Sequence, residues 1–325
     1  MGLVPNIRQS VLSRIWEELK HINYQQLNAK TSGSYTVCLL GTHADIEAMR
    51  AWLECLRYPA LEAWIPAGTR LAPPDRRRMA RHVHAIVVQD AGDIAALPAE
   101  HEAALRDCMF ALTPERWRSL LHGRTMRAYV WHEDAGEDLV ADILEDLPQQ
   151  RFALSYVLPV FRPQHARMEI RATALQNASW AVFSAAPNLI PNPGQLISVP
   201  TEAVSDFLVM TVNEIKMMFE LVALCGRKVQ PLQCMPEFGI VLGLAKAAEM
   251  TATNLTGKAP GVGMAIKGGV AFAFTSAIGE ALFLYEIAGV QLGGEFIRER
   301  ARVWLEEGKA ATAKLLKRGA KEKET

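Results

Sequence analysis

The most informative segment of the chain is residues 35–48, which read Tyr-Thr-Val-Cys-Leu-Leu-Gly-Thr-His-Ala-Asp-Ile-Glu-Ala. The run Tyr35–Leu40 is apolar and rich in strand-forming side chains, Gly41 ends it, and a helical pattern follows through Arg57. Strands that are apolar throughout and alternate with helices are typical of a parallel sheet covered on both faces.

Similar apolar runs alternate with helical patterns up to residue 161. We expect strands at Val83–Gln89, Cys108–Leu112, Met126–Trp131 and Phe152–Phe161, with a weaker one near Leu61–Ile65. Helices are expected between them at Pro98–Arg106, Pro114–Leu121 and Glu137–Leu147. Residues 35–162 are therefore predicted to be a Rossmann-like α/β domain with a parallel sheet.

The segments on either side of this domain show helical periodicity only. Residues 1–34 are predicted to be an amphipathic helix and a polar linker, and residues 163–325 an all-α helical bundle domain. Gly226 suits the left-handed residue that ends a helix, and the prolines of residues 188–194 indicate a rigid loop. The expected helices are Gln164–Ala186, Val204–Cys225, Glu237–Asn254, Gly261–Gly289 and Gly294–Arg318.

The charge balance argues against nucleic acid as a partner. Lys+Arg and Asp+Glu number 35 each, which gives a formal net charge of zero at pH 7, whereas phosphate binding needs an uncompensated basic field. The five cysteines show no CxxC spacing, which indicates a reducing compartment. Arg8, Arg14 and Glu17 interrupt the apolar residues at the N-terminus, so we expect no secretory signal and a cytoplasmic location.

One predicted helix raises the question of a membrane. Residues 259–290 are long and apolar, but they contain Lys267, Glu280 and Glu286, each of which would cost about 2.5–3.5 kcal/mol at the bilayer centre. We therefore expect a buried helix of a bundle, with an integral membrane protein as the alternative. The last helix has an apolar face and a basic end, which also fits peripheral contact with the inner face of a membrane. Pairs of glycines four residues apart, Gly239 with Gly243 and Gly257 with Gly261, indicate close packing of helices.

The loop after the first strand stands where a phosphate-binding loop would stand. Gly41, Thr42 and His43 are the candidate nucleotide-binding residues there, together with Asp90 after the second strand. The simpler interpretation, which we favour, is that Gly41 permits a sharp turn and that Asp90 is a turn residue or helix cap. A P-loop requires Gly, Lys and Ser or Thr at the positions that Ile46, Glu47 and Ala48 occupy, and the dinucleotide fingerprint fails as well. We expect the Glu47 carboxylate to repel a triphosphate, so the loop is predicted not to work as a P-loop.

Other loops offer weaker candidates for chemistry. Gln89 stands where an Asp would be needed in an Asp-x-x-Gly magnesium turn, and the acidic run His132–Asp138 suits the start of a helix as well as a cation. His82 and His84 lie on one strand without an evident third ligand, so no metal or other cofactor is predicted. No catalytic nucleophile is evident in the sequence. Ser184 lacks the Gly-x-Ser-x-Gly motif of a nucleophile elbow, and Ser155 and Cys38 lie in predicted strands.

Polar residues within the apolar helices are expected to have a structural role. Asn177, Asp206 and Asn213 are predicted to form a network between helices, because a buried amide or carboxylate needs a partner. A binding site is the alternative interpretation of the same residues. Met210, Met217 and Met218 are expected to fill the core.

Several of these motifs resemble the helical domain of the YcjF-like bacterial proteins of unknown function. The resemblance covers roughly residues 155–290 and rests on Leu158–Arg162, Gln176–Ala178, Ala186–Pro191, Asp206, Val209–Asn213 and Gly226. Members of that family are often fused to, or encoded beside, Era-like GTPases, and some are associated with membranes. The resemblance implies that residues 35–162 are a degenerate GTPase-like domain.

Together these features predict a non-catalytic two-domain protein that acts through protein partners, such as a GTPase or a membrane-associated complex, or at a membrane surface. The alternative is a weakly nucleotide-binding or metal-dependent enzyme that uses the loops after the strands.

Overall fold

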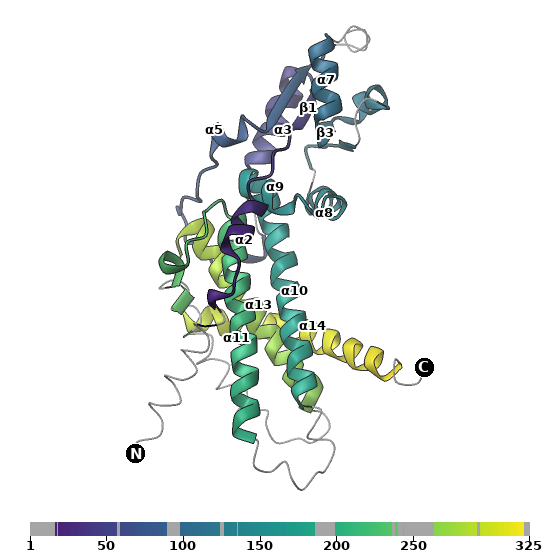
Figure 1. The fold of residues 1–325 in the computed structure, drawn as a ribbon. Coiled ribbons are helices and arrows are strands. Elements are labelled where there is room, and N and C mark those ends of the chain that lie inside the picture. The colour runs from purple at the N-terminus through teal and green to yellow at the C-terminus, as the bar shows by residue number, and fades with distance from the viewer. Residues whose placement is uncertain are drawn as a thin grey trace. The chain divides into compact units, whose positions relative to one another are not determined.

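The computed structural model describes residues 17, 19–56, 59–89, 98–123, 127–134, 136–185, 199–235, 238–239, 243, 263–290 and 293–321. The chain forms two compact units (Figure 1). We call Asn28–His165 with Ala223–Arg227 the sheet unit, and Met1–Leu27, Ala166–Val222 and Lys228–Thr325 the helical unit.

The sheet unit contains a four-stranded parallel sheet with the strand order β2-β1-β3-β4. Val37 at the start of β1 pairs with Val83 of β2 on one side and with Phe110 of β3 on the other. The prediction of a parallel sheet is confirmed. The strands are β1 (Val37–Gly41), β2 (Val83–Val87), β3 (Phe110–Thr113) and β4 (Ala128–Val130).

The core of the sheet unit follows from the apolar strands and from one face of each helix. All residues of β1 are buried, and helix α3 (His43–Glu54) buries Ile46, Met49 and Leu53 at three- and four-residue spacing. The other helices of the unit are α4 (Pro59–Glu62), α5 (Arg76–Met79), α7 (Ala99–Asp107), η1 (Glu115–Leu121), α8 (Glu137–Asp146), α9 (Arg151–Val157) and η2 (Pro159–Phe161).

Two predicted strands are helical instead. Residues 152–161 form most of α9 and all of η2, and residues 61–65 contain the end of α4 and a turn. The predictions were wrong because a short apolar run fits a helix buried on all sides as well as it fits a buried strand. In α9 the residues from Phe152 to Ser155 are all buried, so the segment lacks the polar face that identifies a helix in a sequence.

The predicted N-terminal helix is interrupted within its described part. Residues 21–23 are not helical, and α2 (Tyr24–Lys30) begins after them. The Asn23 side chain accepts a hydrogen bond of 2.8 Å from the backbone N–H of Gln26. An asparagine that caps a helix in this way starts a new helix rather than continuing an old one.

The helical unit is built mainly from long helices. The chain passes between the units within α2, α10 (Arg162–Ala185) and α11 (Val199–Leu224), and again between Arg227 and Lys228. Helices α13 (Gly263–Ala288) and α14 (Gly294–Lys321) lie wholly in the helical unit. Gly226, two residues after α11, has φ +92°, as its predicted role at a helix end requires. Most of the predicted helix Glu237–Asn254 and the whole loop 188–194 lie outside the described residues.

Helices α13 and α14 pack closely through glycines. A Cβ atom on Gly308 would lie 2.7 Å from the carbonyl oxygen of Gly269, and one on Gly268 would lie 2.6 Å from Thr312 Cγ2. Gly239 and Gly243, which we expected to support such packing, would have no atom within 4 Å of an added Cβ, and Gly257 and Gly261 lie outside the described residues.

Helix α13 is long and apolar enough to span a membrane. In the described part of the chain it is the one helix with this property, over Ala265–Ala288, and 89% of its most apolar window is buried inside the protein. A core helix of a bundle has the same length and composition.

Candidate functional site

The loop between β1 and α3 lies where open parallel sheets bind ligands. The strand order reverses at the β1–β3 pair, because β2 lies on one side of β1 and β3 on the other. Ligands bind outside the carboxyl ends of the strands at such a point. Gly41 ends β1 and Thr113 ends β3, so residues 42–45 and 114–116 belong to this position.

The Asp45 side chain fills this loop. Its Oδ2 accepts hydrogen bonds from the backbone N–H of Thr42, at 2.9 Å, and from the Thr42 hydroxyl, at 2.8 Å. In return the Thr42 hydroxyl accepts the Asp45 backbone N–H at 3.3 Å, which completes a capping box at the start of α3. A carboxylate therefore occupies the helix N-terminus, which would otherwise attract the phosphate of a ligand.

Gly41 leaves room for this carboxylate. A Cβ atom on Gly41 would lie 2.7 Å from Asp45 Cβ and 3.0 Å from Asp45 Oδ2. Gly41 is a strand residue and is not among the glycines with positive φ. The close approach of Asp45, rather than a sharp turn, accounts for the glycine at this position.

An arginine of η1, which follows β3, contacts the same carboxylate. Arg116 Nη2 donates to Asp45 Oδ2, and only 14% of the Asp45 side chain is exposed. The carboxylate is therefore neutralised by a cation that would otherwise be available to a bound anion. Arg116 was not among the residues that we singled out in the sequence, because 71 positions separate it from Asp45.

These contacts predict a dependence of stability on acid. Partial burial opposes ionisation of Asp45, but the hydrogen bonds from Thr42 and Arg116 outweigh it and hold the pKa of the Asp45 carboxyl below its usual value. A lowered pKa stabilises the folded state above the unfolded-state pKa of about 4, and the effect is lost as the pH falls through the folded-state pKa. We expect Asp45→Asn to lower the free energy of unfolding by about 1 kcal/mol at pH 7, and the difference from wild type to shrink towards pH 3 in urea titrations.

The matched control for this experiment is Glu47→Gln on the same helix. Glu47 is exposed and pairs only loosely with Arg50, so its replacement should change the free energy of unfolding by less than about 0.5 kcal/mol at either pH. A difference between Asp45→Asn and wild type that stays constant or grows on acidification would contradict the role given to Asp45.

The other candidate residues of this loop do not lie together around Asp45. His43 is the first residue of α3 and is exposed, and Glu47 lies one turn further along the helix with 74% of its side chain exposed. Glu47 therefore does not occupy the position that we expected from the sequence, and Asp45 does. Gln89 follows β2 and is exposed, whereas Asp90 lies outside the described residues.

The two histidines that we expected on the second strand do not converge, and His82 precedes β2. The ring of His82 stacks on Tyr35 with centroids 4.5 Å apart, and its Nδ1 lies 3.0 Å from the Tyr35 carbonyl oxygen. His84 instead lies against His101 of α7, with centroids 5.7 Å apart. Within the described ranges, no group of three or more His, Cys, Asp or Glu side chains is placed to hold a metal ion. Glu137 and Asp138 of the acidic run lie in the first turn of α8.

The candidate nucleophiles with described side chains are buried. Ser155 lies in α9, not in a strand, and its hydroxyl is 2.9 Å from Nδ1 of His165; neither residue is exposed to solvent. Cys38 in β1 is fully buried, and burial, with a further contribution from Cys108, raises the pKa of its thiol. A substrate has no access to these groups as they stand. Ser184 lies in α10, and its side chain is outside the described set.

In the helical unit the structure brings Asn177 and Asn213 together. Asn213 Nδ2 donates to Asn177 Oδ1 at 2.9 Å, and Asn177 Nδ2 donates to the Thr275 hydroxyl at 3.0 Å. Thr275 in turn donates to Glu214 Oε1 at 3.1 Å, so the network links α10, α11 and α13. Asp206 lies in α11, but its side chain is outside the described set. Met217 and Met218 are fully buried.

A buried ion pair that we did not anticipate joins α13 to α14. Arg300 Nε and Nη2 donate to the two carboxylate oxygens of Glu280 at 2.6 and 2.9 Å. The Glu280 side chain is not exposed at all, and that of Arg300 is 10% exposed. A glutamate in the middle of an apolar helix is the sequence signal for such a pair, because a buried charge needs a partner.

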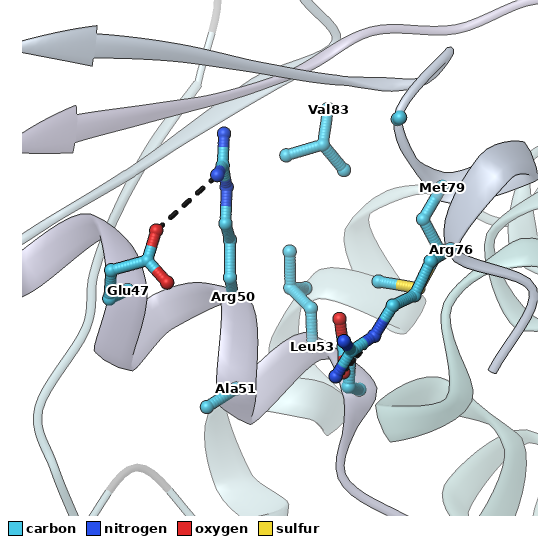
Figure 2. A pocket seen from close by; sticks show the side chains of 9 residues that line it. Glu47, Arg50, Ala51, Leu53, Arg76, Met79 and Val83 are labelled. Carbon is cyan, nitrogen blue, oxygen red and sulfur yellow. Dashed lines mark hydrogen bonds and ion pairs between the residues drawn. The ribbon is translucent and has the colours of Figure 1, made fainter. Parts of the chain in front are cut away.

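A second feature of the sheet unit is a pocket of about 450 Å³. It is lined by residues of α3 and α5, by Ala80 and by Val83, the first residue of β2 (Figure 2). Because Val83 starts β2 whereas Gly41 ends β1, the pocket does not coincide with the loop that Asp45 fills.

Comparisons of the chain with protein-family models, with curated proteins and with solved structures find no match.

Proposed function

We propose that this chain is a non-catalytic two-domain protein that acts through protein partners or at a membrane surface. In this proposal the sheet unit is a Rossmann-like, degenerate GTPase-like domain, and the helical unit is similar to the helical domain of the YcjF-like proteins. The strand order β2-β1-β3-β4, with its reversal between β1 and β3, supports the Rossmann-like part of the proposal. The proposed location is the cytoplasm, with the inner face of a membrane as a place of contact.

The observation that supports a non-catalytic role most directly is the Asp45 carboxylate at the head of α3. This carboxylate accepts hydrogen bonds from the backbone N–H of Thr42 and from the guanidinium of Arg116. A bound phosphate would accept hydrogen bonds from the same two groups. A triphosphate would have to displace a carboxylate of the same charge and break its ion pair. The sequence lacks, in addition, the lysine and the hydroxyl residue that complete a P-loop.

The proposal predicts that the purified chain neither binds nor hydrolyses nucleoside triphosphates. We expect no saturable heat on calorimetric titration with GTP or ATP and Mg²⁺ up to about 1 mM, a limit that corresponds to about −4 kcal/mol. We also expect no phosphate release above the rate of a sample without protein. Micromolar binding accompanied by turnover would refute the proposal.

Two variants show which carboxylate excludes the anion. Asp45→Asn removes the charge within the loop, whereas Glu47→Gln removes the exposed charge one turn away. We expect Asp45→Asn to bind GTP weakly, at least severalfold better than wild type, and Glu47→Gln to resemble wild type, because a charge acts most strongly at short range. If Glu47→Gln alone gained binding, the exclusion would not come from Asp45.

A further inference from the structure

The pocket of the sheet unit combines an apolar interior with charged walls. Leu53 of α3 is fully buried at its base, and Met79 of α5 and Val83 of β2 stand beside it. Arg50 and Arg76 lie on opposite sides of the cavity in Figure 2, with the apolar side chains between them. The volume of about 450 Å³ lies within the range of small-molecule sites, and four of the nine lining residues are charged.

The two arginines differ in how fully their hydrogen-bonding capacity is used. Arg76 holds Glu54 through Nε at 3.2 Å and Nη2 at 2.8 Å, and the Glu54 side chain is 24% exposed. Among the described residues, Arg50 makes one long contact, 3.4 Å from Nη1 to Glu47 Oε1, and the two side chains are 48% and 74% exposed. A guanidinium has five N–H donors, so Arg50 keeps most of its capacity for a ligand.

The lining of the pocket carries two arginines and two glutamates, and the excess of positive charge comes from the adjoining segment of α5. Glu54 is already paired, and Glu47 is solvated at the rim. Residues 75–81, which supply α5 and its flanks, contain four arginines and one aspartate. Among them Arg77 and Arg81 are exposed on the surface of the unit and add to the positive field.

We propose that this pocket binds a small carboxylate with a short aliphatic chain. The carboxylate takes the place of Glu47 at Arg50, where it accepts two parallel N–H bonds, and the chain lies against Met79 and Val83 above Leu53. This ligand site is independent of the proposed function, since it uses neither Asp45 nor the loop after β1.

The exchange at Arg50 is energetically favourable. An exposed ion pair is weak, so loss of the Glu47 contact costs little. A bidentate guanidinium–carboxylate contact is stronger than the single long contact that it replaces. Burial of the aliphatic chain adds a favourable contribution that grows with the apolar surface removed from water.

The probe for this proposal is sodium hexanoate, titrated into the full chain labelled with ¹³C at its methionine methyl groups. Met79 lines the pocket, so its methyl resonance, assigned with Met79→Leu, should shift and saturate. Acetate, which has the charge without the chain, should bind at least about tenfold more weakly, and hexylammonium, which has the chain with the opposite charge, should leave the resonance unchanged.

Three variants test the arginine. Arg50→Gln should weaken hexanoate binding by about tenfold or more, and Glu47→Gln should tighten it because the competing carboxylate is gone. Arg77→Gln, which lies outside the pocket and acts only through the positive field, should weaken binding by less than about twofold. Arg50 is half exposed, so its variant should keep the melting temperature of the wild type. Equal hexanoate affinity in Arg50→Gln and wild type, binding of hexylammonium at the same site, or no saturable shift would each overturn the proposal.

Discussion

Replacing Arg300 with methionine is expected to lower the free energy of unfolding by about 3–5 kcal/mol. The replacement leaves the Glu280 carboxylate in the interior of the helical unit, where its side chain has no exposed surface, without the two N–H donors that now hold it. A buried charge that loses a bidentate partner keeps much of its cost of desolvation, which explains the size of the effect. Urea unfolding followed by far-ultraviolet circular dichroism measures it.

Two further variants separate the lost pairing from a general effect of changing α14. Arg302→Met removes an arginine from the same helix that pairs with Glu299 at the surface, and it should cost less than about 1 kcal/mol. Glu280→Met combined with Arg300→Leu removes both charges and should recover most of the stability, since apolar side chains can replace a buried pair. A double variant as unstable as Arg300→Met would show that packing, not charge, causes the loss.

The second large effect is expected from Gly308→Val in α14, with a loss of about 2–3 kcal/mol. A Cβ at this position would lie 2.7 Å from the Gly269 carbonyl oxygen and 3.0 Å from Phe272 Cβ. The oxygen belongs to the backbone of α13, so relief requires the two helices to move apart rather than one side chain to rotate. The melting temperature should fall accordingly.

The control for Gly308 is Gly294→Ala at the start of α14. No atom lies within 4 Å of a Cβ built on Gly294, so this change should leave the melting temperature the same or slightly higher. If Gly308→Val melted at the wild-type temperature, the close contact of α13 and α14 would not contribute to stability.

The positions of the four strands could be predicted from local pattern, and the residue that fills the loop also had a local signal, which we did not use. Apolar runs that end at Gly41 and Thr113 identify strands because burial on both faces removes the polar alternation. The choice between Asp45 and Glu47 depends on where each side chain points from α3. The Thr42-x-x-Asp45 spacing of a capping box was the available sequence signal, and it places Asp45 at the helix N-terminus.

The ion pairs and the pocket that we did not predict are formed by residues far apart in the sequence. Arg116 contacts Asp45 from η1, which follows another strand, and Arg300 contacts Glu280 from another helix. The pocket between Arg50 and Arg76 likewise requires α3 and α5 to lie side by side. The distances between residues so far apart in the sequence cannot be predicted from periodicity or from spacing along the chain.

The amino-acid sequence alone determined that a parallel sheet is followed by helices, and that the loop after β1 lacks the residues of a P-loop. Both conclusions depend on neighbours in the chain, which fix local conformation and the chemistry of a short loop. Only the tertiary structure decided that Arg116 pairs with Asp45, that Arg300 pairs with Glu280 and that a pocket lies beside Arg50. The physical reason is that packing brings together side chains from separate elements, and their distances decide which charges are neutralised.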